Sequence, residues 1–225
     1  MMKKARYICL EGTEGVGKTT QTQKLVDFLR SSGYKVLQTK EPGTPHAPLT
    51  MQLRGIMLDK QYDEQLTTQA RELISQAIRS IHLERVIVPA LHEYDFIIQD
   101  RGILSGLSYG SACGNETSML ESIAKYILPI SLKSPFAPYD IYDDVIYLRG
   151  NIKEGLKKAI SSKQEFATGD AMEAKGSMFL ENVSSNMDRI GQRFYAKVVD
   201  VDGKSIDEVF SDILNILDIS DIKEL

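Results

Sequence analysis

One stretch near the start of the chain limits what the rest can be. Residues 12–19, Gly-Thr-Glu-Gly-Val-Gly-Lys-Thr, fit the pattern G-x-x-x-x-G-K-[ST]. The apolar run Tyr7–Leu10 precedes it, and Lys18–Ser32 has the apolar spacing of a helix. Glycines let backbone N–H groups close around a phosphate, and the following helix directs its positive N-terminal end at the same anion. The sequence therefore predicts a phosphate-binding loop between a buried strand and a helix.

Individual residues of this loop have predicted roles toward a bound nucleotide. Lys18 would reach the outer phosphates, and Thr19 would offer its hydroxyl to a magnesium ion. The alternative is a glycine turn that matches the pattern by chance. The residues expected to hold the nucleotide phosphates are Gly12, Thr13, Glu14, Gly15, Val16, Gly17, Lys18, Thr19 and Thr20.

Composition excludes several classes of protein. The chain has 225 residues, of which 42% are hydrophobic and 26% charged, an ordinary globular balance. A net charge of −4 gives no support for wrapping nucleic acid, and no apolar run reaches the length of a membrane span. The only cysteines are Cys9 and Cys113, which we interpret as reduced thiols of a cytoplasmic protein.

Predicted strands alternate with predicted helices along the whole chain. This order implies an α/β fold with a parallel sheet and helices on both faces, and ligands then bind beyond the carboxyl ends of the strands. We expect one domain over residues 1–225. The predicted strands are Tyr7–Leu10, Lys35–Thr39, Phe96–Asp100, Val145–Leu148 and Ala196–Val201. The predicted helices are Lys18–Ser32, Leu49–Leu58, Thr67–Leu91, Ile103–Ala112, Met119–Leu128, Ile152–Ile160, Met178–Phe194 and Ser205–Leu217.

Some predictions concern single helices and loops. In the long helix, Pro89 marks an end or a kink. Residues 133–142 contain two prolines and are a predicted loop. Residues 161–176 lack apolar periodicity and are predicted to form a mobile loop. The residues with helical spacing in the long helix are Leu73, Ala77, Ile81 and Val88. Those expected to face inward from the last helix are Ile206, Phe210, Ile213 and Leu217.

A second motif lies at the end of the third predicted strand. Phe96–Asp100 is a buried run that ends on an acid, as in a strand whose carboxylate holds magnesium beside a phosphate loop. Arg101 follows at once, and its guanidinium would grip a second phosphate bidentately. The alternative for Arg101 is a solvated surface arginine.

With these motifs in place, the chain resembles the thymidylate kinases, a branch of the P-loop nucleoside monophosphate kinases. The Glu-Pro-Gly and Asp-Arg pieces at these separations are more selective than the phosphate loop, which many ATPases and GTPases share. The segments that carry the resemblance are Glu11–Gln21, Lys40–Thr44, Leu53–Leu58, Arg79–His82 with Pro89–Leu91, and Asp100–Ser105 with Tyr109.

The resemblance implies a three-layer α/β/α P-loop NTPase fold with a mostly five-stranded parallel sheet. It also implies that ATP is the donor, that Mg²⁺ is held by Thr19 and Asp100, and that Lys18, Asp100 and Arg101 take part in catalysis. No nucleic acid or membrane partner is expected, and relatives are commonly homodimers.

The same resemblance implies roles in binding the acceptor nucleotide. Glu14 would meet the sugar 3′-hydroxyl, and Arg54 and Arg101 would hold the acceptor phosphate. Tyr109 would pack on the sugar and disfavour a 2′-hydroxyl, or is simply a core tyrosine. Arg79 would hydrogen-bond the pyrimidine, unless it is a solvated helix arginine. The full set of expected substrate-binding residues is Glu14, Glu41, Pro42, Arg54, Arg79, Arg101, Ser105 and Tyr109.

The chain departs from the family at the base and at the lid. The position of the family's stacking phenylalanine is Ser75, and the glutamine after the tyrosine is Gly110. The lid, about residues 161–176, lacks an arginine. Lys163 would replace it as a point charge. The alternatives are that Lys163 and Lys175 are both solvated, or that a lysine of the preceding helix, at 157 or 158, serves instead.

The activity implied is ATP-dependent phosphorylation of a deoxynucleoside monophosphate, dTMP to dTDP. One alternative is a kinase for a modified pyrimidine or another deoxynucleotide. Another is a P-loop protein that binds nucleotides without catalysis. A GTP switch is disfavoured because the chain has no Asn-Lys-x-Asp tetrapeptide.

Overall fold

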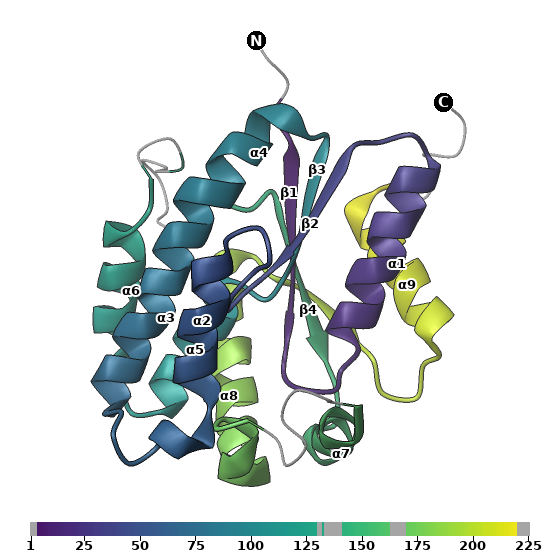
Figure 1. Cartoon of the computed structure of the whole chain (residues 1–225). Coiled ribbons are helices and arrows are strands. Elements are labelled where there is room, and N and C mark those ends of the chain that lie inside the picture. Colours follow the sequence, from purple (N-terminus) through teal and green to yellow (C-terminus); the bar gives the residue numbers. More distant parts are fainter. Residues whose placement is uncertain (1–3, 130–131, 133–140, 163–169, 220–225) are drawn as a thin grey trace.

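The strands form one parallel sheet. A computed structural model describes residues 4–129, 132, 141–162 and 170–219 of the chain. Within these residues five strands form the sheet in the order β2-β3-β1-β4-β5. The parallel sheet expected from the sequence, and the five strands that the resemblance implied, are thus confirmed (Figure 1). The strands are β1 (Arg6–Gly12), β2 (Val36–Lys40), β3 (Phe96–Asp100), β4 (Asp144–Arg149) and β5 (Lys197–Asp200).

The register of the strands brings three loops to one edge of the sheet. Leu10 of the central strand β1 is level with Asp100 of β3, and Asp100 is level with Lys40 of β2. Because all the strands are parallel, their carboxyl ends meet at this edge. The phosphate-loop motif, the Glu-Pro-Gly loop and the Asp-Arg turn therefore begin side by side.

Helices cover both faces of the sheet and complete three layers (Figure 1). Apolar residues of α1 and α9 form one core cluster with the strands, and those of α4, α5 and α8 form the other. Among the described residues, no helix is both long and apolar enough for a bilayer. The α-helices are α1 (Lys18–Ser31), α2 (Pro48–Leu58), α3 (Thr68–His82), α4 (Val88–Glu93), α5 (Ile103–Ala112), α6 (Thr117–Tyr126), α7 (Ile152–Ser162), α8 (Gly176–Gly191) and α9 (Ile206–Leu217).

The long central helix accommodates its proline through a widened turn. Residues Leu83–Ile87 form a π-helical turn that joins α3 to α4, and the Val88 N–H bonds the Leu83 carbonyl. Pro89, which has no N–H, follows in the first turn of α4, where such a donor is not needed. The helix therefore continues to Glu93 instead of ending at the predicted Leu91.

Several local predictions need correction. Leu73 is 59% exposed and Ala77 is exposed, so this part of the apolar spacing does not face the core. Ile206 is 54% exposed, because Val209 takes the inward position with Ile213 and Leu217. Part of the predicted lid loop is helical: α7 reaches Ser162, and a 3₁₀ turn covers Glu173–Lys175. The rest of that lid, 163–169, and most of the predicted loop at 133–142 lie outside the described residues.

Candidate active site

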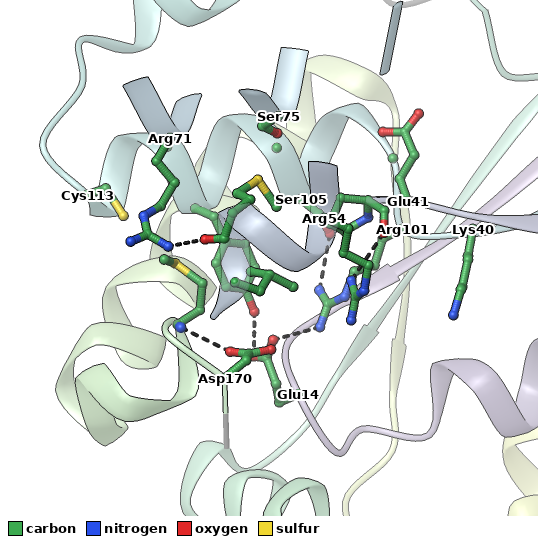
Figure 2. Close-up of a pocket in the computed structure, with 18 of the residues that line it drawn as sticks. Glu14, Lys40, Glu41, Arg54, Arg71, Ser75, Arg101, Ser105, Cys113 and Asp170 are labelled. Carbon is green, nitrogen blue, oxygen red and sulfur yellow. Dashed lines mark hydrogen bonds and ion pairs between the residues drawn. The ribbon is translucent and has the colours of Figure 1, made fainter. Parts of the chain in front are cut away.

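A cavity of about 1060 Å³ opens at the carboxyl edge of the sheet (Figure 2). It is lined by the β1–α1 and β2–α2 loops, the β3–α5 turn, and the facing sides of α2, α3 and α5. Most of the site residues predicted from the sequence meet here. Those lining the cavity are Glu14, Gly15, Gly17, Lys18, Thr19, Thr20, Glu41, Pro42, Arg54, Arg79, Asp100, Arg101, Ser105 and Tyr109.

The β1–α1 loop has the backbone form that a phosphate site requires. Gly15 and Gly17 have φ of 70° and 92°, and α1 starts without a side-chain cap or an acid in its first turn. The N-terminal N–H groups of α1 are therefore left for an anion. The Lys18 ammonium lies over the loop and donates to the Thr13 carbonyl at 2.5 Å. Gly12, Thr13 and Val16 do not line the cavity; the Val16 side chain packs in the core.

The loop also touches the start of α7 directly. A Cβ built on Gly15 would lie 1.8 Å from the Gly155 carbonyl oxygen, and one built on Gly155 would lie 2.4 Å from the Glu14 carbonyl oxygen. Neither position has room for a side chain. The phosphate loop and α7 therefore meet backbone to backbone.

Thr19 and Asp100 form the pair expected for a divalent cation. The Thr19 hydroxyl donates to Asp100 Oδ2 at 2.7 Å, while Asp100 Oδ1 is buried with no hydrogen-bond partner among the described residues. A hard cation prefers such oxygen ligands, so these residues fit Mg²⁺. No cluster of three or more His, Cys, Asp or Glu occurs as a metal site in the described part of the chain. Phosphate oxygens and water would thus complete the coordination.

Arg101 reaches across the mouth of the phosphate loop. Its backbone has φ of 63°, and its guanidinium donates to the Gly12 carbonyl at 2.6 Å and to the Glu14 carboxylate at 2.9 Å. The Tyr109 hydroxyl donates to the other oxygen of Glu14, and the Tyr109 ring lies 5.4 Å from the Arg101 guanidinium carbon. The arginine predicted to grip a second phosphate therefore faces the cavity in front of Lys18.

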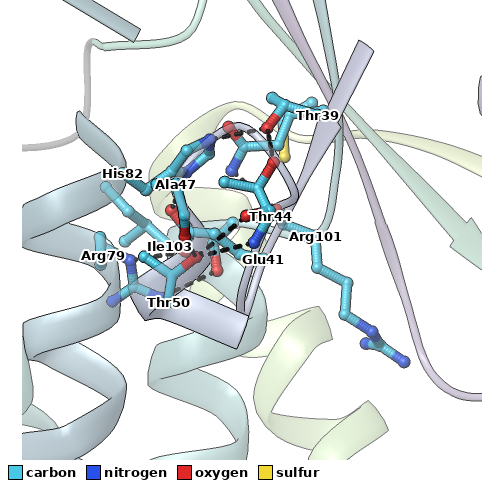
Figure 3. Close-up of polar contacts among 12 residues, drawn as sticks. Thr39, Glu41, Thr44, Ala47, Thr50, Arg79, His82, Arg101 and Ile103 are labelled. Atoms are coloured by element: carbon cyan, nitrogen blue, oxygen red, sulfur yellow. Dashed lines mark hydrogen bonds and ion pairs between the residues drawn. The ribbon is translucent and has the colours of Figure 1, made fainter. Parts of the chain in front are cut away.

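A buried polar cluster fixes the wall beside α3. Glu41 accepts from Arg79 Nε at 2.9 Å and contacts His82 Nδ1 at 3.0 Å, and the other His82 nitrogen meets the Thr39 hydroxyl at 2.8 Å. Figure 3 shows Glu41 between Arg79 and His82, with the Arg101 side chain extending away from them. Burial raises the pKa of the Glu41 carboxyl, but Arg79 and His82 outweigh this and lower it overall. Glu41 thus positions Arg79 at the cavity.

A model of the thymidylate kinase family matches residues 10–213. The chain belongs to the thymidylate kinase family. It is 31% identical over 193 residues to the thymidylate kinase of Synechococcus sp. (strain CC9605), covering 83% of this chain and 85% of the relative. It is 32% identical over 212 residues to that of Acholeplasma laidlawii, covering 93% and 96%.

The fold comparison agrees with this assignment. The crystal structure of thymidylate kinase from Ehrlichia chaffeensis superposes with a TM-score of 0.69 at 21% identity, over 96% of this chain and 99% of that one. The family, the three-layer P-loop fold and the class of nucleoside monophosphate kinase predicted from the sequence are therefore confirmed.

No role was predicted from the sequence for Glu11. In the structure, Glu11 holds the turn that carries Asp100 and Arg101. The Glu11 carboxylate is fully buried and accepts from the N–H groups of Gly102 and Ser105 at 2.9 and 3.2 Å, and from the Ser105 hydroxyl. These donors belong to the first turn of α5, so Glu11 anchors the helix that follows Arg101. Burial raises the pKa of Glu11, which the Ser105 hydrogen bonds partly offset. A glutamate at the end of an apolar run was the only available signal.

No role was predicted from the sequence for Glu72. It lines the cavity from α3 at 7% exposure, and its Oε1 accepts from Gln76 Nε2 at 2.6 Å. Ser75, predicted to replace the stacking phenylalanine, also lines the cavity, as does Gly110 on α5. The wall of the cavity beside α3 therefore carries polar Glu72 and Ser75, where the resemblance led us to look for an aromatic ring.

Lys18 and Arg101, two cationic residues of the cavity, differ in the direction in which the site shifts their pKa. Burial, together with the Arg101 charge, lowers the pKa of Lys18 to about 8, although Asp100 and Glu14 oppose the shift. Burial also tends to lower the pKa of Arg101, but Tyr109, Glu14 and Asp100 raise it overall. Arg101 therefore keeps its positive charge as the pH rises, whereas Lys18 loses its proton near pH 8.

Proposed function

We propose that the protein transfers the γ-phosphoryl group of ATP to dTMP, giving ADP and dTDP. The observation that carries this is the position of Arg101, whose guanidinium is 2.6 Å from the carbonyl of Gly12 in the phosphate loop and lines the same cavity as Lys18. Two groups that bind phosphate thus face each other across one space. These groups lie at the edge of one sheet, which supports a single catalytic domain over residues 1–225.

The donor side is the phosphate loop. The N–H groups of residues 12–20 and the Lys18 ammonium would bind the β- and γ-phosphates of ATP. Thr19 and Asp100 would hold Mg²⁺, which offsets negative charge on those phosphate oxygens. The neutral Thr19 hydroxyl and the half-buried Asp100 carboxylate keep their places through their mutual hydrogen bond.

The acceptor side is formed by Arg101 and the residues around it. Arg54 and Arg101 would grip the dTMP phosphate, one oxygen of which attacks the γ-phosphorus as the bond to the β-phosphate oxygen breaks. Glu14 would accept a hydrogen bond from the sugar 3′-hydroxyl, and Tyr109 would pack on the deoxyribose. The remaining proposed contacts are from Arg79 and Pro42 to the base and from Glu41 and Ser105 within the pocket.

Several lysines are candidates for the positive charge expected from the lid. Lys163 lies outside the described residues, whereas Lys175 lines the cavity and its ammonium lies 5.6 Å from the centre of the Phe179 ring. Lys157 is exposed on α7. Alanine variants at Lys163 and Lys175, compared by kcat at saturating substrate, would identify which lysine acts in the transition state.

The proposed activity is tested by ADP formation from ATP and Mg²⁺ with each natural deoxynucleoside monophosphate. We expect turnover with dTMP, and none without an acceptor. Tight ATP binding with no turnover of any monophosphate would instead establish a protein that binds nucleotides without catalysis.

Exposed apolar side chains support the homodimer that the family resemblance implies. Leu49 and Ile56 of α2 are 54% and 41% exposed, and Leu73 of the adjacent α3 is 59% exposed. Exposed apolar side chains on neighbouring helices are typical of interfaces. We expect light scattering after size exclusion to give a dimer that Leu73→Glu disrupts and that Met178→Glu, on the exposed side of α8, leaves intact.

A further inference from the structure

Three polar side chains of α3 form a buried row against α5. Glu72, Gln76 and Arg79 are 7%, 2% and 3% exposed, and their spacing of four and three residues puts them on one face of the helix. Gln76 bonds both neighbours, donating to Glu72 at 2.6 Å and accepting from Arg79 at 3.1 Å. A hydrogen-bonded row therefore replaces the apolar stripe that a buried helix face usually carries.

Two glycines of α5 make room for this row. A Cβ on Gly106 would lie 2.3 Å from Arg79 Nη2, and one on Gly110 would lie 2.7 Å from Glu72 Oε2. These glycines are one turn apart, so Arg79 and Glu72 approach the cavity about 6 Å apart along α5. One position presents a donor and the other an acceptor.

Acceptor oxygens collect at the Gly110 end. Glu72 Oε1 is used by Gln76, which leaves Oε2 on the Gly110 side. Asn115, 9% exposed, also lines the cavity: its Nδ2 donates to the Gly110 carbonyl at 3.2 Å, while its Oδ1 is buried with no hydrogen-bond partner among the described residues. Two side chains from different elements thus offer acceptors at one place, and a buried acceptor without a donor costs free energy.

The geometry points to a pyrimidine deoxynucleoside monophosphate with a C4 carbonyl and a hydroxyl-bearing substituent at C5, of which 5-hydroxymethyl-dUMP is the simplest. This inference rests on the proposed function, which places the base beside Arg79. The carbonyl would accept a hydrogen bond from Arg79, and the hydroxyl would donate one to Glu72 Oε2. Ser75, on α3 between Glu72 and Arg79, also lines the cavity.

Thymine satisfies this site less well. Its 5-methyl group has no proton to donate, so binding thymine would exclude water from the Glu72 oxygen and supply no partner. Sites built to hydrogen-bond a substrate group discriminate strongly against analogues that lack it. Cytosine presents an amino group at C4, where Arg79 requires an acceptor, and is therefore disfavoured.

The test is a comparison of kcat/KM for dTMP, 5-hydroxymethyl-dUMP, dUMP and dCMP with ATP and Mg²⁺. We expect 5-hydroxymethyl-dUMP to exceed dTMP by about tenfold or more, the range of a hydrogen bond to a charged group. Turnover of dTMP with no advantage for the hydroxymethyl substrate would overturn this inference and leave the proposed function standing. No turnover of any monophosphate would overturn both.

Variants of Glu72 give an independent readout from the same ratio. Glu72→Leu is expected to bring the hydroxymethyl-to-methyl ratio down at least tenfold, and Glu84→Leu, at an exposed position of the π turn, to leave it unchanged. Thermal unfolding of each variant checks that it is folded. A hydroxymethyl-to-methyl ratio that is unchanged in Glu72→Leu overturns the inference. Turnover of dCMP that exceeds that of dTMP and depends on Glu72 also overturns it, because the group that donates to Glu72 would then be the amino group at C4.

Discussion

Arg101 and Glu14 form an ion pair at 2.9 Å in which both side chains are largely buried, at 17% and 10% exposure. Glu14 belongs to the phosphate loop and Arg101 to the turn after β3, so the pair joins the proposed donor and acceptor sides of the cavity. Tyr109 donates to the same carboxylate, which adds α5 to the arrangement. The arginine proposed to bind the acceptor phosphate is thereby held in place by the protein's own contacts.

Arg101→Lys should lower kcat/KM for dTMP by about 10²-fold or more. Lysine keeps the charge but loses the planar fork that meets the Gly12 carbonyl and Glu14 together. Steady-state ADP formation measures the effect. Arg193→Lys, in an exposed pair with Glu121, is the matched control and should retain full activity. Equal kcat/KM for the two variants would contradict the role given to Arg101.

Affinity for ATP should fall as the pH rises above 8. Burial lowers the pKa of Lys18 to about 8, and only the protonated ammonium attracts phosphate. The free protein therefore loses this charge through pH 8, and Kd should rise by about tenfold for each further pH unit. Calorimetry at pH 7, 8 and 9 in two buffers of different ionisation enthalpy should detect proton uptake on binding. A Lys18→Met variant should bind ATP weakly and take up no proton on binding. The same proton uptake in the variant would show that a group other than Lys18 takes up the proton.

Asp100→Asn should raise the Mg²⁺ concentration needed for half-maximal activity by about tenfold or more. The amide keeps the shape of the side chain but removes the negative charge on the oxygen that lacks a partner beside Thr19. A Mg²⁺ titration at fixed ATP measures the change. Asp207→Asn, at an exposed carboxylate paired with Lys24, should leave the titration unaltered. An unchanged midpoint in Asp100→Asn would remove Asp100 from the metal site.

His82→Leu should lower the free energy of unfolding by about 1–3 kcal/mol, because one oxygen of the buried Glu41 loses its donor. Urea denaturation followed by circular dichroism gives the value. His46→Leu is the control: its ring bonds the Gln38 carbonyl at an exposed position, and the effect should stay within about 0.5 kcal/mol. Similar losses for the two variants would show that the Glu41 cluster adds no particular stability.

The strand and helix order was predictable because its signals are local. Phe96–Asp100 and Ile103–Ala112 have the predicted bounds, and the phosphate loop carries its glycines in sequence. The π turn before Pro89 was not predictable, since a proline signals that a hydrogen bond is lost but not how the helix absorbs the loss. Leu73 misled the prediction because hydrophobic spacing does not distinguish a core face from an exposed one.

The site was predictable where a motif carried it and unpredictable where packing did. Lys18, Asp100 and Arg101 lie within recognisable segments, and all three line the cavity. Glu72 has no such segment: in the sequence it is one more charged residue of a helix. Only the fold shows that two glycines of α5 leave space for it and that it is buried.

The contact of Gly15 with Gly155 has a mechanical consequence. Side chains accommodate strain by rotating, but two bare backbones in contact have no such freedom. A displacement of the loop toward α7 would therefore move that helix, whose far end is the point where the lid was predicted to begin. If the proposed donor site shifts the loop in this direction when a nucleotide binds, the helix would follow without a separate signal between them.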